Sequence, residues 1–184
     1  MMIPPMQPTL SDDLVLLRPL TEADREALFA VASDPLIWAI HPAHNRWERT
    51  VFDAFFSEGL PSNGALVIID RATGVVIGSS RYDIRVCEEG EVEIGWTYLA
   101  RSHWGGVYNR SIKRLMLAHA FTKFDGVIFL VGETNMRSRR AMEKIGARLT
   151  DRRQDWDMAG TDVSHLIFAI TRDEFAEGPL RLSN

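Results

Sequence analysis

The chain has 184 residues, 46% of them hydrophobic and 25% charged, which suits one domain of ordinary size. Its single cysteine, Cys87, excludes a disulfide framework and a multi-cysteine zinc site. Lysine and arginine number 21 against 25 aspartates and glutamates, a net charge of −4, which disfavours nucleic-acid binding because phosphate neutralisation needs a basic surface. No apolar run reaches the ~18 residues of a membrane-spanning helix. The first residues lack the basic start and the apolar core of a signal peptide. We therefore expect a soluble, cytoplasmic protein with no membrane partner.

Prolines and a lack of periodicity at 1–13 predict an extended N-terminal arm, and residues 14–184 form one predicted domain. Helices are predicted where apolar residues recur at helical spacing: from Thr21, over 46–59, from Gly105-Gly106 to about 124, and over 135–145. Strands are predicted where apolar or β-branched residues run between turns: at 14–19, 65–70, 75–86, 91–99, 127–134, 149–158 and 163–171. The order β-α-α-β-β-β-α-β-α-β-β, with a helical turn at the end, predicts an α+β domain with a mixed sheet.

Alternation along strand 91–99 divides its side chains between two faces. The apolar face carries Val92, Ile94, Trp96 and Tyr98, and the opposite face carries Glu91, Glu93, Gly95 and Thr97. Trp96 and Tyr98 are therefore predicted to point into the core.

A glycine turn, Gly105-Gly106, leads from this strand into the third helix. The first N–H groups of a helix lack partners within it, and together with the helix dipole they bind anions such as a pyrophosphate. Arg110, Lys113 and Arg114 would add positive charge at the same end. The alternative is a tight turn with no ligand.

A second polar segment runs from Asn135 to Gly146, where Asn135 stands at the N-cap and Gly146 closes the helix. Helical spacing places Ser138 in one stripe with the apolar residues Ala141, Met142 and Ile145. Capping by itself would explain Asn135, and Ser138 could bond back to its own helix.

Together the two segments resemble the acetyl-CoA-binding motifs of the GNAT N-acetyltransferases, in particular the RimJ/RimL-like branch of bacterial ribosomal-protein N-terminal acetyltransferases. His103-Trp104-Gly105-Gly106-Val107-Tyr108 matches that branch's aromatic-W-G-x-G-Y segment in part. The N-x-x-S-x-R-x-x-E-K-x-G pattern is matched throughout, by Asn135, Ser138, Arg140, Glu143, Lys144 and Gly146. The resemblance covers about Leu14 to Thr171. It departs at Val107 and Asn109, where the family has glycine or alanine, so either the loop binds phosphate in a helical conformation or cofactor affinity is reduced.

The resemblance implies a single GNAT-type domain: a mixed, mostly antiparallel sheet with helices on both faces, and a central parallel pair of strands splayed to hold acetyl-CoA. It places the pantetheine of acetyl-CoA on the backbone of Thr97 and Leu99 and on the side chain of Asn135. It also implies cofactor contacts from the glycine loop and the second motif, at Gly105, Gly106, Val107, Tyr108, Asn109, Arg110 and Arg140.

The resemblance further implies that a primary amine, on a protein N-terminus or a small molecule, attacks the thioester directly, without metal or covalent intermediate. Glu93 is the candidate base; Glu91 could exchange roles with it, and the alternative for Glu93 is an ion pair with Arg81 or Arg85. Ser138 is the candidate acid for the leaving thiolate, since many family members have a tyrosine where Met142 stands. Contacts with the acceptor amine are expected from the first two helices and their connection, at Trp38, His41, His44 and Trp47, although each ring by itself could instead be part of the core.

A second functional hypothesis is a degenerate GNAT domain that serves as an acyl-CoA sensor or interaction module without catalysis. Val107, Asn109 and Met142 favour this hypothesis, whereas the intact segment from Asn135 to Gly146 opposes it. Dimers are frequent in this branch, so a homodimer is a candidate assembly.

Overall fold

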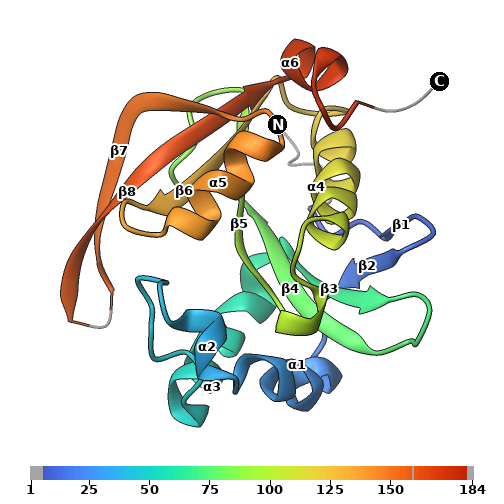
Figure 1. The fold of residues 1–184 in the computed structure, drawn as a ribbon, viewed down its shortest axis with the longest axis vertical. Helices are drawn as coiled ribbons and strands as arrows, with labels where there is room; N and C mark the ends of the chain where they lie inside the picture. Colours follow the sequence, from blue (N-terminus) through green and yellow to red (C-terminus); the bar gives the residue numbers. More distant parts are fainter. Residues whose placement is uncertain (1–5, 159, 182–184) are drawn as a thin grey trace.

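The computed structural model describes residues 6–158 and 160–181, which form one eight-stranded sheet in the order β1-β2-β3-β4-β5-β6-β8-β7 (Figure 1). Neighbouring strands are antiparallel except β5 and β6, which are parallel. The predicted α+β domain with a mixed, mostly antiparallel sheet and one parallel pair is thereby confirmed.

The elements follow the predicted order with a few additions. The strands are β1 (Leu10–Ser11), β2 (Val15–Pro19), β3 (Ala65–Asp70), β4 (Val76–Asp83), β5 (Glu91–Leu99), β6 (Gly126–Gly132), β7 (Arg148–Met158) and β8 (Thr161–Thr171). The α-helices are α1 (Arg25–Ala32), α2 (Pro35–Trp38), α3 (Arg49–Gly59), α4 (Val107–Ala120), α5 (Met136–Lys144) and α6 (Arg172–Glu177). Short 3₁₀ turns, η1 (Glu22–Asp24), η2 (Leu60–Ser62) and η3 (Arg101–His103), join some of them.

The described end of the predicted N-terminal arm is joined to the sheet. Strand β1 pairs with β2 at Leu10 and Ser11, and the Gln7 side chain donates a hydrogen bond to the Ala65 carbonyl at 2.9 Å. The predicted arm covers 1–13, and its first five residues lie outside the described part of the chain.

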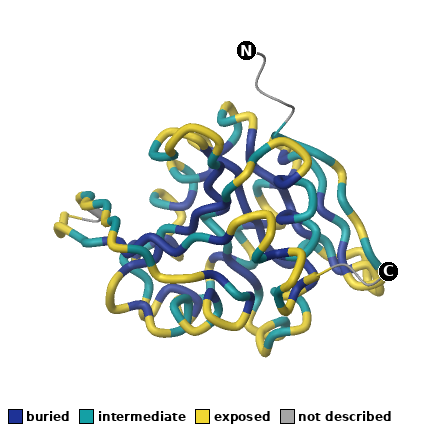
Figure 2. Tube along the Cα trace, turned by 90° about the horizontal axis from the view of Figure 1, so that it is seen from above, coloured by how far each residue is buried: buried dark blue, intermediate teal, exposed yellow. Residues whose placement is uncertain are grey.

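Helices cover both faces of the sheet, as predicted, and each face has its own core. On one face, Ile112 and Met116 of α4 and Met142 of α5 pack with sheet residues such as Val92 and Ile94. On the other face, residues of α1, α2 and α3 form a second cluster. Figure 2 shows the resulting arrangement, with buried segments inside and exposed segments around them.

A bulge near the end of β5 overturns the predicted alternation along this strand. Trp96 has a φ of 52°, and the β4–β5 register shifts between Ser79 and Arg81. An extra residue in one strand reverses the side-chain order beyond it. Ile94 therefore packs on the α4 side while Tyr98 packs with the helices of the other face, and Trp96 is only half-buried. The prediction that Trp96 and Tyr98 share the face of Val92 and Ile94 is wrong.

The parallel pair is short, and this opens the sheet. Strands β5 and β6 are in register only from Glu91 to Glu93, opposite Gly126 to Ile128, although β5 continues to Leu99 and β6 to Gly132. Beyond Glu93 the two strands diverge, so backbone groups of β5 on this side have no partner in β6. This confirms the predicted splay of the central pair. No helix in the described residues is long and apolar enough to cross a membrane.

Candidate active site

The turn before α4 is tight at its two glycines. Gly105 and Gly106 have φ values of 109° and 115°, which residues with a side chain rarely adopt. Helix α4 then begins at Val107, and the Arg110 amide donates back to the Gly106 carbonyl at 2.9 Å. The amides of Val107, Tyr108 and Asn109 precede the first helical hydrogen bond. Val107 and Asn109 are both helical, so the backbone conformation at these two positions does not require the glycines of the family pattern.

Of the three basic residues predicted at this helix start, only Arg110 is exposed and without an ion pair to a described residue. Arg110 is exposed and donates to the Pro179 carbonyl at 2.9 Å. Arg114 pairs with Asp12 at 3.0 Å, and Lys113 is 2% exposed. The prediction of a joint cationic cluster is wrong, since the helical period turns Lys113 toward the sheet together with Ile112 and Met116.

The Lys113 side chain contacts β5, next to the opening between β5 and β6. Its Nζ donates to Oγ1 of Thr97 at 2.7 Å, and that hydroxyl lies 2.7 Å from Oγ of Ser80. Burial lowers the pKa of Lys113 to about 7. The sequence gives little signal of this position, because a lysine among other cations on a helix normally indicates a solvated face.

The second motif forms a capped helix, as predicted. Oδ1 of Asn135 accepts a hydrogen bond from the Ser138 amide at 3.2 Å, and Asn135 is 3% exposed. The Ser138 side chain is half-buried, and its hydroxyl makes no hydrogen bond with any described residue. Met142 lies in the core, and Arg140 is exposed.

Glu93 stands where β5 and β6 separate, and its carboxyl is 4% exposed. It forms no ion pair or hydrogen bond with the described side chains. The two alternative partners are engaged elsewhere: Arg81 lies 3.5 Å from Glu58, and Arg85 lies 3.0 Å from Asp83. Burial and, secondarily, the neighbouring Asp83 raise the pKa of Glu93 to about 8.

Glu91, on the same strand, is in a different state. Its two oxygens accept from Arg152 at 2.8 and 3.0 Å. Burial opposes its ionisation, but these hydrogen bonds and one from the Glu88 amide outweigh it and hold the pKa below its usual range. Glu91 is therefore committed to an ion pair, and Glu93 is the free carboxyl of the two.

Trp104 and Arg137 connect the end of β5 to α5 and α2. Nε1 of Trp104 donates to the Leu99 carbonyl at 3.0 Å, and the Arg137 guanidinium lies 4.2 Å from the Trp104 ring centroid. Arg137 also donates to the Ile37 carbonyl at 2.8 Å. One predicted pantetheine contact, the Leu99 backbone, thus already accepts one hydrogen bond at its carbonyl.

Residues 15–148 match the family model of the acetyltransferase (GNAT) domain. The chain belongs to the GNAT acetyltransferase family. The resemblance carried by the two motifs is confirmed, and the protein is an N-acetyltransferase by family.

Solved GNAT structures share this fold at low sequence identity. A GCN5-related N-acetyltransferase from Brucella melitensis is 21% identical, with a TM-score of 0.80 over 92% of this chain and 80% of that one. RimJ from Mycobacterium smegmatis, in complex with CoA-disulfide, is 19% identical, with a TM-score of 0.70 over 95% and 90%. Spermidine N-acetyltransferase from Vibrio cholerae, in complex with CoA and spermine, is 14% identical, with a TM-score of 0.68 over 89% and 99%. No curated protein matches the chain in sequence.

The four residues predicted to contact the acceptor do not form one patch in this GNAT domain. Trp38 is 1% exposed, and its Nε1 donates to the Ala32 carbonyl at 2.8 Å, so it belongs to the core. His41 is half-buried and accepts from the Ala43 amide at 2.9 Å, and burial lowers its pKa to about 3. His44 and Trp47 are exposed. For Trp38 the alternative of core packing holds and direct contact with the acceptor does not, because the short helix α2 turns its ring inward against Tyr98.

The burial of two arginines on this side of the GNAT sheet was not predicted. Arg46 and Arg81 are 9% and 3% exposed. Arginines are mostly exposed in proteins, so their sequence positions carry no signal of burial. The single cysteine is not a reactive alternative, since burial raises the pKa of Cys87 to about 12.

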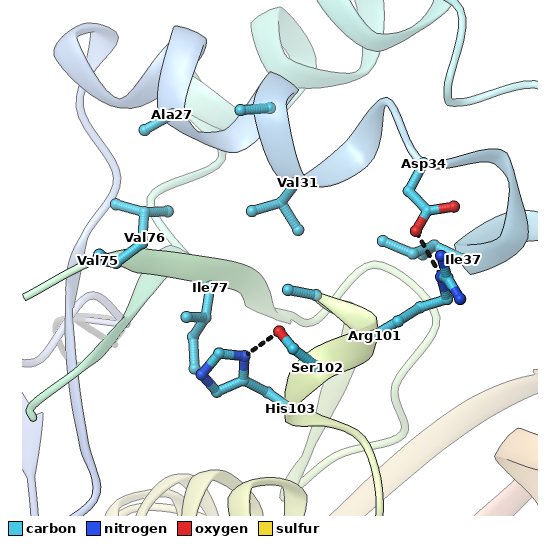
Figure 3. A pocket seen from close by; sticks show the side chains of 12 residues that line it. Ala27, Val31, Asp34, Ile37, Val75, Val76, Ile77, Arg101, Ser102 and His103 are labelled. Carbon is cyan, nitrogen blue, oxygen red and sulfur yellow. Dashed lines mark hydrogen bonds and ion pairs between the residues drawn. The ribbon is translucent and has the colours of Figure 1, made fainter. Parts of the chain in front are cut away.

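A hollow of about 740 Å³ lies apart from these residues, between α1, β4 and η3 (Figure 3). Most of its lining is apolar, as at Val31, Val76 and Ile77, and Arg101 pairs with Asp34 beside it. Neither Glu93, Asn135 nor the glycine turn lines it. We therefore do not place the acetyl transfer there.

Proposed function

We propose that this GNAT enzyme transfers an acetyl group from acetyl-CoA directly to a primary amine on a small molecule or a peptide N-terminus. One observation carries the proposal: a buried carboxyl without a partner, that of Glu93, lies at the point where β5 and β6 separate. A buried carboxyl with a raised pKa is suited to take a proton from an amine.

The splay and the start of α4 supply complementary groups for acetyl-CoA. In the proposal, the pantetheine lies along β5 against the backbone of Thr97 and Leu99, with the side chain of Asn135 opposite. The pyrophosphate lies on the backbone amides at the start of α4, which are aimed out of the helix. The remaining proposed contacts come from the same loop and from α5, at Gly105, Gly106, Val107, Tyr108, Asn109, Arg110 and Arg140.

Glu93 acts as the base in the proposed reaction. The amine nitrogen forms a bond to the thioester carbonyl carbon, the carbon–sulfur bond breaks, and the carboxylate of Glu93 takes the proton that the nitrogen loses. An α-amino group has a pKa of roughly 8, so a carboxyl with a pKa of about 8 exchanges a proton with it at little cost. The half-buried hydroxyl of Ser138 is the proposed proton donor to the leaving thiolate, because Met142 has no proton to give; Ser138 regains a proton from solvent, and Glu93 releases its proton to solvent.

The test is transfer itself. Purified protein is titrated with acetyl-CoA, CoA and desulfo-CoA by calorimetry. The release of CoA thiol is then followed with a panel of primary amines, and the products are identified by mass spectrometry. We expect micromolar binding of acetyl-CoA and an acetylated amine. Absence of binding up to millimolar acetyl-CoA would overturn the proposal and favour the degenerate interaction module.

Substituting Gly106 by alanine tests the pyrophosphate site. A side chain at a φ of 115° costs about 1–3 kcal/mol, so the turn should shift and move the helix-start amides. We expect acetyl-CoA binding to weaken about 5- to 100-fold in calorimetry. The matched control is Gly74→Ala, because Gly74 also has a positive φ, 71°, but lies in the β3–β4 turn. Equal affinity in both variants would contradict the placement.

The four acceptor residues predicted from the sequence contribute unequally to this proposal. His41, His44 and Trp47 belong to the connection that faces the acceptor, while Trp38 supports it from the core. A cytoplasmic location and a homodimer stay predictions of the sequence.

A further inference from the structure

Arg46 is a buried cation without a partner. It lies just before α3, and its guanidinium packs 4.3 Å from the Phe55 ring centroid and 5.6 Å from that of Trp38. It forms no hydrogen bond or ion pair with the residues that the structure describes. Burial lowers its pKa to about 10, and the charge of Arg81 adds to this effect. A buried charge without an opposite charge is costly, so the protein gains by binding an anion here.

Arg81 repeats the pattern on the neighbouring strand. Its guanidinium lies 4.6 Å from the Trp96 ring centroid and 5.9 Å from that of Phe55, and its Nε is enclosed without a hydrogen bond to any described atom. Its carboxylate neighbour, Glu58, is exposed, lies 3.5 Å away and is shared with Arg85 at 3.6 Å. One exposed carboxylate therefore serves two arginines; its charge also reaches Arg46, which forms no ion pair with any described residue.

Both arginines lie on the side of the sheet that carries Glu93; Arg46 is on this side because it packs on Trp38 and Phe55, which belong to the cluster on that face. Arg81 is in register with Gly95, and Glu93 is in register with Asp83, so alternation places all of these on one face. The chain just before Arg46 packs over the end of β6, since a Cβ on Gly132 would lie 2.4 Å from Cγ of Pro42. The charge of Arg46 also acts on His41 and on His165, and His165 is in register with Gly132, so Arg46 lies on the side of this strand end.

The other titratable groups around the pair do not cancel its charge. Asp83 is paired with Arg85, and the raised pKa of Glu93 keeps this carboxyl largely neutral near pH 7. His41 is uncharged, and burial also lowers the pKa of His165. The acceptor side is thus locally positive, although the whole chain carries a net charge of −4.

The space available differs between the two arginines. The cavity lined by Phe55, Arg81, Trp96 and Tyr98 has a volume of about 10 Å³, which suits one water and no larger group. The nitrogens of Arg46, unlike Nε of Arg81, are not among the fully enclosed polar atoms that lack a partner. The Arg46 nitrogens therefore keep some accessible surface, whereas Nε of Arg81 is enclosed, so Arg46 is the contact we assign to a ligand and Arg81 contributes charge from behind.

We propose that the acceptor amine also carries a carboxylate, as amino acids and acidic peptides do, and that Arg46 binds this carboxylate with Arg81 reinforcing it. This inference rests on the proposed acetyl transfer and names the substrate class for the same site. A guanidinium binds a carboxylate through paired, charge-assisted hydrogen bonds. The same positive charge repels polyamines, so spermidine should be a poor acceptor.

Matched acceptors test the inference directly. Initial rates of CoA release are measured for amino acids and short acidic peptides. They are compared with the rates for the same compounds after each carboxylate is converted to an amide, and for the corresponding amines without a carboxylate. Spermidine is measured as a further acceptor. We expect kcat/KM to be about 10- to 100-fold higher for the carboxylates, the effect of one charge-assisted hydrogen-bonded contact. Equal kcat/KM for acids and amides, or a preference for spermidine, would overturn the inference while leaving acetyl transfer intact.

Arg46 variants tie the preference to the site. Arg46→Gln should lower kcat/KM for the acid about 10- to 100-fold, change that for the amide less than 3-fold, and leave acetyl-CoA binding unchanged. Arg46→Lys should retain part of the preference because it keeps the charge. Arg71→Gln, in the exposed β3–β4 turn, is the matched control. An equal loss on acid and amide in Arg46→Gln would overturn the assignment.

A binding measurement separates the two proposals. Calorimetry of the CoA complex with an N-acetylated amino acid and with its amide requires no turnover, and we expect only the acid to bind, with Arg46→Gln abolishing the difference. Failure of acetyl-CoA to bind would overturn the proposed function, and this inference would fall with it. Normal acetyl-CoA binding with equal affinity for acid and amide would overturn this inference alone.

Discussion

Replacing Glu93 with glutamine is expected to lower kcat/KM for acetyl transfer by about 100- to 10,000-fold, the contribution of a positioned base. In the native protein, kcat/KM should rise with pH through about 8, because burial holds the carboxyl protonated below that pH. Glu93→Gln should lose this rise with an acceptor amine whose own pKa lies well below 8, so that ionisation of the acceptor does not add to the profile. Steady-state rates of CoA release between pH 6 and 10 measure both effects.

Stability provides the internal control for Glu93→Gln. Because the pKa of Glu93 is raised to about 8 in the folded state, the native protein binds more protons than the unfolded chain between about pH 4.5 and 8. Its carboxyl therefore reduces the free energy of unfolding as pH rises through this range. Glu93→Gln should be at least as stable as the native protein at pH 9, so its loss of activity would not reflect unfolding.

Glu91→Gln is the matched substitution on the same strand. It breaks the ion pair with Arg152 and should destabilise the fold, while the pH dependence of kcat/KM stays in place. Activity in Glu93→Gln within a few-fold of the native protein, or loss of the pH dependence in Glu91→Gln instead, would show that Glu93 is not the base.

Replacing Lys113 with methionine is expected to stabilise the protein at neutral pH by on the order of 3–5 kcal/mol. This figure is the free energy that corresponds to the lowered pKa of Lys113, less the contribution of its hydrogen bond to Thr97. The pKa falls from 10.5 to about 7 on folding, so the unfolded chain binds more protons between these values. The free energy of unfolding of the native protein therefore rises from about pH 7 to 10.5. In Lys113→Met this rise should disappear.

Denaturant unfolding at pH 6, 7, 8.5 and 10 measures the effect. The control is Lys123→Met, since Lys123 follows the same helix but is exposed and should change stability by less than about 0.5 kcal/mol. A less stable Lys113→Met at pH 7, or a native protein whose stability is constant across this range, would contradict burial of the ammonium.

Local sequence determined most of the element order and the helix ends. The capped helix from Asn135 to Gly146 and the glycine turn before α4 depend on side chains and φ angles within a few residues. The period of apolar residues likewise reports which segments form helices and strands. These features were predicted correctly because their physical causes lie inside each segment.

The details of the site depend on contacts between distant segments. The bulge at Trp96 arises from the pairing of β5 with β4 and moves Tyr98 to the opposite face. The Trp38 ring was a candidate contact for the acceptor but packs on Tyr98, 60 positions away in sequence.

Charged residues show the same limit most clearly. Lys113 contacts Thr97, Arg81 faces Glu58 rather than Glu93, and Arg46 packs on aromatic rings without a counterion among the described residues. The sequence by itself determined that a GNAT-like acetyl-CoA site was to be expected, and in which segments. Only the tertiary structure decided which charges are buried and which remain unpaired, because burial and ion pairing are set by the neighbours that folding brings together.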